Sequence, residues 1–539
     1  MAQHPRGKSM RAGPLRLACL WCALIIPMVS GVDTAAIGIP PSTNWDGNDG
    51  LWSSFAVQIG TPPQTMRVLP STSGSSVWVV VAEGCSPATD PQDCPERRGG
   101  LFASNASSTL VQKGIYELPL HVGEILGYSG NGQFAYDQIT LGGNGAGGPA
   151  LNNTIFAGIA TKDFLIGTMG LTPWGVNFTD FNNPVPSLLT SLKNAGHVIS
   201  NSWGYSAGAF YSPKQTFGSL TFGGYDASRF VPNNLTFTRG PDISRDLLIG
   251  IQTITSGTDS LLPKGVVAMI DSTVAQIWLP NEACRRFEEV FGLVWDETVE
   301  LYLVNDTLHQ KLVDQDPSIT FTIGSTTTSS DIINIILPYG AFDLTADWPL
   351  TTNGTARYFP LRRAANASQV VLGRTFLQEA YLIVDYDRNN FSVSRAVFPD
   401  TNVPQRLVTI LPPSEKGSSH GRLAKGAIIG IGVGTTAIIV ALIATILYLM
   451  RRRWLPSAAK IQVTTNALEE TKPELDAKQN PRIPAGTLLN STPVEAEGIQ
   501  RFPRQMYDPS IIRPEVQGDS RRPAELADGT RVVGYELSG

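Results

Sequence analysis

The sequence predicts an all-β protein built from two related lobes, and three observations lead to this prediction. Only 16% of the 539 residues are charged, whereas about 25% is usual for a soluble protein. Gly (52 residues) and Pro (38 residues) are abundant, which favours frequent turns. Runs with strand character dominate residues 50 to 399, and two parts of this region repeat each other. The net charge of −5 argues against a nucleic-acid partner, and a hydrophobic share of 42% excludes a wholly disordered chain.

Short runs of β-branched and aromatic residues between turn residues predict strands. Examples are Phe55–Ile59, Met66–Leu69, Gln138–Leu141, Ser219–Phe222, Val266–Ile270, Ser318–Ile323 and Tyr381–Asp385. Helical periodicity is confined to Val185–Asn194 and Glu282–Phe291. We therefore expect an all-β architecture with a few small helices.

Two segments, 70–79 (PSTSGSSVWV) and 270–279 (IDSTVAQIWL), align at an offset of 200 residues. Each places a tryptophan seven residues after a turn residue, Trp78 after Ser71 and Trp278 after Asp271. A second matching pair, at 169–171 and 372–374, follows about a hundred residues later in each half. Chance similarity of turn sequences accounts for one pair, but two pairs in the same order predict a duplicated lobe.

Two apolar runs predict the topology of the chain. The first, 17–29, follows several basic residues and holds 13 residues, which is too short to span a bilayer and typical of a signal peptide. The second, 427–450, holds 24 residues without a charge and is followed by Arg451, Arg452 and Arg453. We therefore expect a single-pass type I membrane protein with these arginines in the cytosol, most naturally in the plasma membrane. A retained signal anchor is the alternative reading of the first run.

The expected organisation is a signal peptide (1–31), an N-terminal extension (32–49), an N-terminal β lobe (50–215), a C-terminal β lobe (216–399), a stalk (400–426), a transmembrane helix (427–450) and a cytosolic disordered tail (451–539). The proline-rich tail without apolar periodicity predicts disorder and an unidentified cytosolic partner. Gly426, Gly430 and Gly434 have a spacing at which two membrane helices pack closely, so a homodimer is a further hypothesis.

Sequons and cysteines agree with an ectodomain in an oxidising compartment. Acceptor sequons for N-glycosylation occur at Asn105, Asn152, Asn177, Asn234, Asn305, Asn353, Asn366 and Asn390. Cys85 and Cys94 are expected to form a disulfide, because two cysteines without nearby histidines lack the ligands for a metal site. Cys284 is left over, either as a buried thiol or as one half of an intermolecular bridge. No metal and no cofactor is predicted.

Several motifs then identify a family resemblance. They are the segments 55–64 (FAVQIGTPPQ), 66–80, 101–110, 136–143, 218–226, 266–280 and 372–381. Over roughly residues 50–398, the chain resembles the pepsin-like aspartic peptidases. The resemblance implies a bilobal fold with a peptide or protein ligand in the cleft between the lobes. Membrane anchoring makes the chain similar to fungal members of this family.

The resemblance also implies where the chemistry would lie. The family uses one aspartate from each lobe, and the pair shares a proton because two close like charges do not both ionise easily. The second turn keeps its aspartate as Asp271, followed by Ser272 and Thr273. The first turn reads Ser71, Thr72 and Ser73, so Ser71 replaces the first aspartate. Ser73 and Thr273 stand where the family has glycine. Asp46 and Asp49, upstream, are conceivable substitute acids, but family geometry gives them no route to the turn.

The flap that covers the cleft in this family also departs from the pattern. Its tyrosine is represented by Tyr128, which lies only eight residues before Tyr136, about three fewer than the family has. A shorter flap is expected to exclude less water. We therefore predict a pseudopeptidase that acts as an extracellular binding or sensing module. The alternatives are an active or weak aspartic endopeptidase at the cell surface and a structural surface glycoprotein.

Overall fold

The computed structural model describes residues 35–120, 122–178, 183–351, 354–399, 403–413 and 444–450. The chain divides into two compact units, 1–422 and 423–539. Of the second unit, only the helical residues 444–450 are described. In the described part of the chain, no helix is both long and apolar enough to cross a membrane. Apart from 444–450, the predicted span 427–450 lies outside the described residues.

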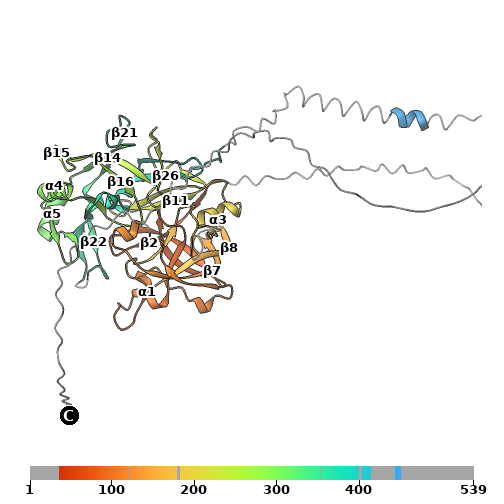
Figure 1. Ribbon diagram of the computed structural model, residues 1–539, viewed down its shortest axis with the longest axis horizontal. Coiled ribbons are helices and arrows are strands. Elements are labelled where there is room, and N and C mark those ends of the chain that lie inside the picture. The colour runs from red at the N-terminus through yellow and green to blue at the C-terminus, as the bar shows by residue number, and fades with distance from the viewer. Residues whose placement is uncertain are drawn as a thin grey trace, which may run out of the picture. The chain divides into compact units, whose positions relative to one another are not determined.

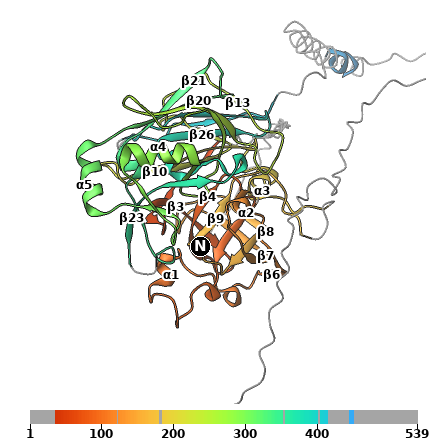
Figure 2. The same cartoon turned by 60° about the vertical axis from the view of Figure 1, so that its left-hand side comes forward.

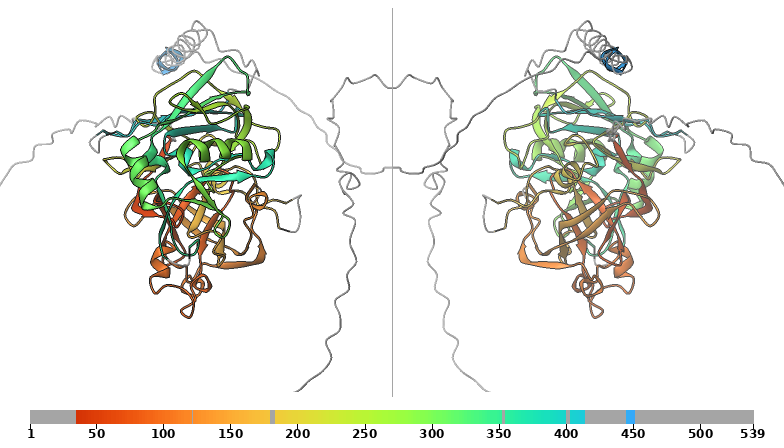
Figure 3. Two further views of the ribbon diagram at one scale, coloured as in Figure 1. Left: turned by 90° about the vertical axis from the view of Figure 1, so that its left-hand side faces the viewer. Right: turned by 90° about the vertical axis from the view of Figure 1, so that its right-hand side faces the viewer.

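The first unit is mostly β and has two lobes, the N-terminal one in red to yellow and the C-terminal one in green to teal in Figures 1 and 3. The N-terminal sheet has eight strands, and its edges approach closure because β3 also pairs with β7. In order across the sheet, they are β2 (Pro41–Asp46), β3 (Trp52–Ile59), β4 (Gln64–Ser71), β9 (Gly167–Gly170), β5 (Val77–Val80), β8 (Ala150–Ile159), β7 (Asn131–Leu141) and β6 (Val111–Glu117).

The C-terminal lobe is built on a second sheet of eight strands. These are β21 (Ile332–Leu337), β20 (Ile319–Gly324), β14 (Leu248–Ser256), β16 (Val266–Ile270), β25 (Val371–Leu372), β17 (Ile277–Pro280) and β24 (Leu361–Ala364), with β15 (Asp259–Ser260) paired to β14. A four-stranded sheet lies in the same half of the chain: β18 (Val294–Asp296), β19 (Leu301–Leu303), β23 (Ala356–Phe359) and β22 (Leu344–Ala346).

The duplication seen in the sequence recurs in the strand pairing. In the N-terminal lobe β4 pairs in parallel with β9, and β5 pairs in parallel with β8. In the C-terminal lobe β16 pairs in parallel with β25, and β17 pairs in parallel with β24. Ser71 therefore ends β4, and Asp271 directly follows β16, at the corresponding point of each lobe.

A six-stranded sheet joins the two halves of the chain. It runs β1 (Ile37–Ile39), β11 (Thr216–Phe222), β10 (Ser202–Ala209), β26 (Ala380–Asp385), β27 (Asn390–Arg395) and β13 (Phe237–Thr238). Two segments that the sequence set apart from the lobes take part in sheets. The predicted N-terminal extension supplies β1 and β2, and the predicted stalk supplies β28 (Leu407–Thr409), which pairs with β12 (Gly224–Asp226).

The helices are short, and Figure 2 shows α5 (Asp306–Gln315) at the outer edge of the C-terminal lobe. They are α1 (Cys94–Arg97), α2 (Val122–Ile125), α3 (Leu188–Asn194), α4 (Asn281–Phe291), α5 (Asp306–Gln315) and α6 (Arg374–Leu377), with single 3-10 turns η1 (Ala82–Gly84), η2 (Ser104–Ala106), η3 (Tyr339–Phe342) and η4 (Ala367–Gln369). The helical periodicity located α3 and α4 but missed α5. Asn305 begins α5, because its side-chain oxygen accepts a hydrogen bond from the Leu308 N–H at 2.9 Å.

Candidate functional site

The two repeated turns lie against each other between the lobes and are joined by hydrogen bonds. The Thr72 N–H donates to Ser272 Oγ at 3.0 Å, and the Ser272 N–H donates to Thr72 Oγ1, also at 3.0 Å. Ser272 Oγ in turn donates to the Pro70 carbonyl at 2.7 Å. Both hydroxyl residues are buried. The reciprocal hydrogen bonds give the backbone N–H groups of Thr72 and Ser272 an acceptor each. They also bring together the two turns, 71–73 and 271–273, that the sequence predicted to form the site.

Asp271 is almost fully buried, with 1% exposure, and is held by its own turn and by the opposite one. The Thr273 N–H donates to Asp271 Oδ1 at 2.9 Å. From the other lobe, Ser73 Oγ lies 3.1 Å from both carboxylate oxygens. Hydroxyl and amide donors of this kind stabilise an ionised carboxylate. The aspartate is therefore supported by two lobes although no second acid faces it across the turn.

Ser71 occupies the position corresponding to Asp271 and is tied into a chain of hydroxyl groups. Its Oγ accepts from the Gly74 N–H at 2.9 Å and lies 2.7 Å from Thr273 Oγ1. Thr273 Oγ1 lies 3.0 Å from Ser73 Oγ, which reaches Asp271. A serine hydroxyl does not ionise near neutral pH and cannot share an acid proton as a second carboxyl group would. The centre thus contains one carboxylate and three linked hydroxyl groups.

The two upstream aspartates considered as substitute acids are engaged elsewhere. Asp46 forms an ion pair with Arg67, with Nε at 2.9 Å from Oδ2. Asp49 pairs with Arg374, with Nη2 at 2.8 Å from Oδ2, and accepts a hydrogen bond from Trp52 Nε1 at 2.7 Å. Neither carboxylate therefore takes the place of the missing aspartate.

Arg374 is a site residue that the sequence reasoning did not assign a role. It follows Gly373, the glycine that matches Gly170 in the repeated segments, and is 4% exposed. Its Nη1 donates to the carbonyls of Ser272 at 2.8 Å and Thr273 at 2.9 Å, while its Nη2 binds Asp49. The guanidinium therefore connects the turn that carries Asp271 to the N-terminal part of the chain. A basic residue in the second of the two matching segments, 169–171 and 372–374, was the available signal.

The segment at the flap position joins the antiparallel strands β6 and β7. Its described residues, 118–120 and 122–130, contain the short helix α2 and Tyr128. Tyr128 stacks on Phe164 with ring centroids 5.5 Å apart, and burial, with the nearby Asp49 charge, raises the pKa of Tyr128 to about 12. Gln369 of η4 donates from Nε2 to the Ile125 carbonyl at 2.6 Å. This loop therefore contacts the opposite lobe. The sequence had predicted a shorter flap that excludes less water from the cleft.

One hollow adjoins this centre, and a second adjoins the first. A small cavity of about 40 Å³ is bordered by Asp49, Tyr128, Thr273 and Arg374, among others, and has room for a few water molecules. A wider, open cleft of about 540 Å³ shares Asp49 and Tyr128 with it and extends to Leu301 and Arg362 of the C-terminal lobe. Its size lies in the range of ligand sites.

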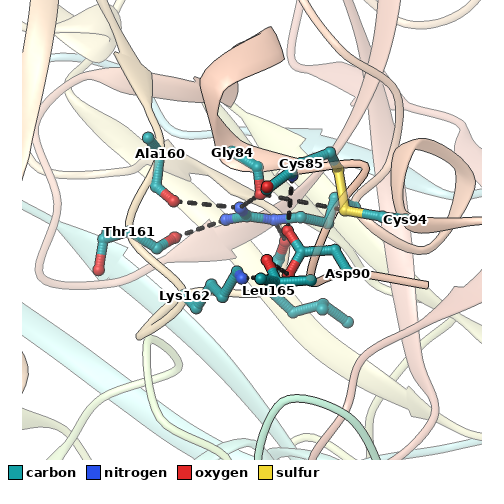
Figure 4. A network of polar contacts seen from close by, with 11 residues as sticks. Gly84, Cys85, Asp90, Cys94, Ala160, Thr161, Lys162 and Leu165 are labelled. Carbon is teal, nitrogen blue, oxygen red and sulfur yellow. Dashed lines mark hydrogen bonds and ion pairs between the residues drawn. A yellow bond between two sulfur atoms is a disulfide. The ribbon is translucent and has the colours of Figure 1, made fainter. Parts of the chain in front are cut away.

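A buried arginine anchors the loop that precedes β9 and bears Phe164. Arg98 is 1% exposed and donates to five backbone carbonyls, of which Gly84, Ala160, Thr161 and Leu165 are labelled in Figure 4. The fifth acceptor is the Phe164 carbonyl at 2.9 Å. Burial lowers the pKa of Arg98 to about 10, so the guanidinium stays charged at neutral pH.

The predicted disulfide is confirmed. Cys85 and Cys94 are bonded beside this network, as Figure 4 shows. Cys284 is buried and free, and burial raises the pKa of its thiol to about 12, so it is a poor nucleophile. Its burial agrees with the first of the two predictions, a buried thiol.

The sequon asparagines are mostly accessible. Asn105, Asn152, Asn177, Asn234, Asn305 and Asn366 are exposed, and Asn390 is half-buried in β27. Asn353 lies outside the described residues, as do Gly426, Gly430 and Gly434. Glycosylation and helix pairing therefore stay predictions.

Comparison with known proteins decides the family. A family model described as "Eukaryotic aspartyl protease" matches residues 54–396. The chain belongs to the eukaryotic aspartyl protease family. It is 25% identical to "Probable aspartic-type endopeptidase OPSB" of Arthroderma benhamiae over 367 residues, covering 64% of this chain and 68% of the relative.

Two further relatives belong to a yeast and to the mouse. "Secreted aspartic protease 8" of Candida albicans is 23% identical, with 65% of this chain and 77% of the relative covered. Cathepsin E of Mus musculus is 25% identical, with 63% and 79% covered. The aspartyl protease fold implies a peptide substrate or ligand in the inter-lobe cleft. That Ser71 and Asp271 stand at the positions of the two catalytic aspartates stays a prediction from the sequence.

Proposed function

We propose that this chain is a pseudopeptidase, an aspartyl protease fold that binds peptide segments at the cell surface without cutting them. The observation that carries the proposal is the contact of Ser73 Oγ with both oxygens of Asp271, next to a serine at the first catalytic position. Hydrolysis in this family needs two carboxyl groups that share a proton and activate a water between them. Here a hydroxyl group occupies the hydrogen-bonding face of the one remaining carboxylate.

The magnitude of the loss supports this proposal. A positioned general acid or base contributes typically about 10²–10⁴ to the rate. Groups that act as a unit lose more than the sum of single contributions when one is removed. Ser71 has no carboxyl group with which to share a proton. Ser73 competes with a water molecule for the Asp271 carboxylate, so activation of that water is impaired as well.

The remaining cleft favours a binding role. Two features support this role: the hydrogen bonds between Thr72 and Ser272 hold the two turns together, and a cleft of about 540 Å³ opens beside Tyr128 of the flap loop. The flap loop also reaches the opposite lobe through Gln369. A peptide bound beneath it would make main-chain and pocket contacts without meeting a reactive water.

An extracellular location is part of the proposal. The relative in Candida albicans is named a secreted protease, and the Cys85–Cys94 disulfide and exposed sequons are typical of the secretory pathway. The charge-free run 427–450 would anchor the protein as a type I membrane protein, with the tail 451–539 in the cytosol. A cytosolic partner of the tail would make the module a sensor.

The test is a protease assay on the full-length protein, purified from a secretory host, between about pH 3 and 6, where carboxyl dyads work. We expect the protein not to cleave denatured protein substrates. Any residual cleavage should be insensitive to an aspartic-peptidase inhibitor. Inhibitor-sensitive cleavage that disappears in the Asp271→Ala variant would instead establish an active endopeptidase. A peptide library screened against the same protein should yield binders, and a Tyr128→Ala variant should bind them more weakly. Absence of any binder would favour a structural role.

A further inference from the structure

The C-terminal lobe carries a second groove, separate from the cleft. It has a volume of about 770 Å³ and lies beside α4, which Figure 2 labels. Leu248, Val266 and Val267 contribute apolar surface, and Val267 is 49% exposed. Exposed apolar surface in a concave site is usually covered by something in the working protein.

The groove also has polar groups that are not fully used. Arg245 lines it, and its Nε is buried without a hydrogen-bond partner among the described residues. Asn281 and Glu282, at the start of α4, also line it and are exposed. The Arg245 side chain as a whole is partly exposed, so its guanidinium is a donor for the hydroxyl or carbonyl acceptors of a ligand in the groove. Apolar surface next to such groups fits a sugar ring, which has an apolar face and a polar rim.

The wall of the groove contains the attachment point for a sugar. Asn366 is exposed, lines the groove and begins the sequon Asn366-Ala367-Ser368. Its side-chain oxygen accepts from the Ser368 N–H at 2.9 Å and also from the Ser368 hydroxyl. This arrangement fixes the oxygen and leaves the amide nitrogen, the atom that carries an N-glycan, for attachment.

We propose that the N-glycan on Asn366 folds back into this groove, with its first sugar rings on the apolar floor and Arg245 as a hydrogen-bond donor to them. Asn105, by contrast, is exposed but is not among the residues that line this groove. The seated glycan would brace the turn η4, which follows directly and whose Gln369 holds the flap loop. This inference rests on the extracellular location proposed above, because only there would the sequon be modified.

The test compares two glycans on the native full-length protein from a eukaryotic secretory host. An endoglycosidase that cuts within the glycan core should release the Asn366 glycan at least about tenfold more slowly than the Asn105 glycan, which corresponds to about 1.4 kcal/mol of protection. After denaturation both should be released at the same rate. Mass spectrometry of glycopeptides reads each site separately.

A substitution in the groove floor tests whether contact with the groove is what slows the release of the glycan. Val267→Asp, at a half-exposed position, should speed native release at Asn366 without changing site occupancy. Val111→Asp, at a position 57% exposed on β6, is the matched control and should leave the rate unchanged. Equal native rates at Asn366 and Asn105, or no effect of Val267→Asp, would overturn the proposal. An unmodified Asn366 in a protein glycosylated elsewhere would overturn it as well, and would leave the extracellular location standing. A protein that carries no glycan at all would contradict the location itself.

Discussion

Ser73 Oγ sits 3.1 Å from Oδ1 and 3.1 Å from Oδ2 of Asp271, although the two residues lie 198 positions apart in the sequence. The hydroxyl is therefore equidistant from the two carboxylate oxygens. Replacing the first aspartate is thus only part of the change at this centre. Ser73, two positions after Ser71, also occupies hydrogen-bonding positions of the Asp271 carboxylate.

This relationship predicts how activity could be restored. Ser71→Asp alone should stay inactive, because Ser73 and Thr273 still fill the centre. The triple variant Ser71→Asp, Ser73→Gly, Thr273→Gly should cleave peptides at least about 10² faster than Ser71→Asp, the lower end of what an acid–base group contributes. Peptide hydrolysis at acidic pH measures this. Adding Asp271→Ala to the triple variant is the control, and activity that survives it would show that the dyad is not the source.

The contact between Gln369 and the Ile125 carbonyl predicts the mobility of the flap loop. Gln369→Glu keeps the acceptor for the Ala365 N–H but loses the donor to Ile125. One hydrogen bond contributes about 1 kcal/mol net, so amide exchange in residues 118–130 should speed up about fivefold. Hydrogen–deuterium exchange measures this. Gln310→Glu, at an exposed position on α5, is the control; equal exchange in both variants would mean that packing of Tyr128 alone holds the loop.

The Arg98 network predicts a large effect on stability. Arg98→Met would leave five backbone carbonyls without their donor, and each buried unsatisfied group costs about 1–3 kcal/mol. The free energy of unfolding should fall by at least about 3 kcal/mol, measured by chemical denaturation. Arg97→Met is the neighbouring control. Its side chain is 37% exposed and pairs with Asp93 and Asp347, so its loss should cost no more than about 1 kcal/mol. Similar losses in both variants would contradict the anchoring role of Arg98.

A buried acid predicts a pH dependence of stability. Burial raises the pKa of Glu379 above its ordinary value of 4.5, although the Tyr211 hydroxyl donates to it and Arg395 is nearby. The folded protein then holds this proton more tightly than the unfolded chain. The contribution of Glu379 to the free energy of unfolding is therefore most favourable below about pH 4.5 and is lost as the pH rises through the raised pKa.

Glu379→Gln removes this titration, so unfolding curves across the acidic range should show wild type losing stability relative to the variant as the pH rises. Tyr211→Phe should extend the loss to higher pH, because the donor that favours the charged carboxylate is gone. A constant difference between wild type and Glu379→Gln at every pH would refute the assignment.

Local patterns predicted the parts of the fold that depend on local sequence. The offset of 200 residues between Ser71 and Asp271 predicted that the lobes would be related, and the parallel pairing of β4 with β9 and β16 with β25 shows the same repeat. The Cys85–Cys94 spacing predicted the disulfide. Alternating and apolar runs located the central strands because burial decides both composition and conformation there.

Non-local contacts were beyond the sequence. Ser73 was recognised only as a lost glycine, since its contact with Asp271 depends on how the two lobes meet. The helix α2 and the bond from Gln369 to Ile125 were missed because a short loop has no periodicity to read. The strands β1 and β28 were assigned to an extension and a stalk, because three-residue strands gain their stability from partners far along the chain.

Those short strands set a condition on biosynthesis. The Ala36 N–H donates to Thr409 Oγ1 at 2.9 Å across 373 residues, and β28 closes beside β12. Contacts of such separation form only after the whole intervening chain has left the ribosome. Until residue 409 has been synthesised, β12 lacks its strand partner, and its backbone groups stay open to chaperones and to neighbouring nascent chains. With the extracellular location proposed above, quality control in the secretory pathway would act on this protein late, after residues 407–409 have been translocated.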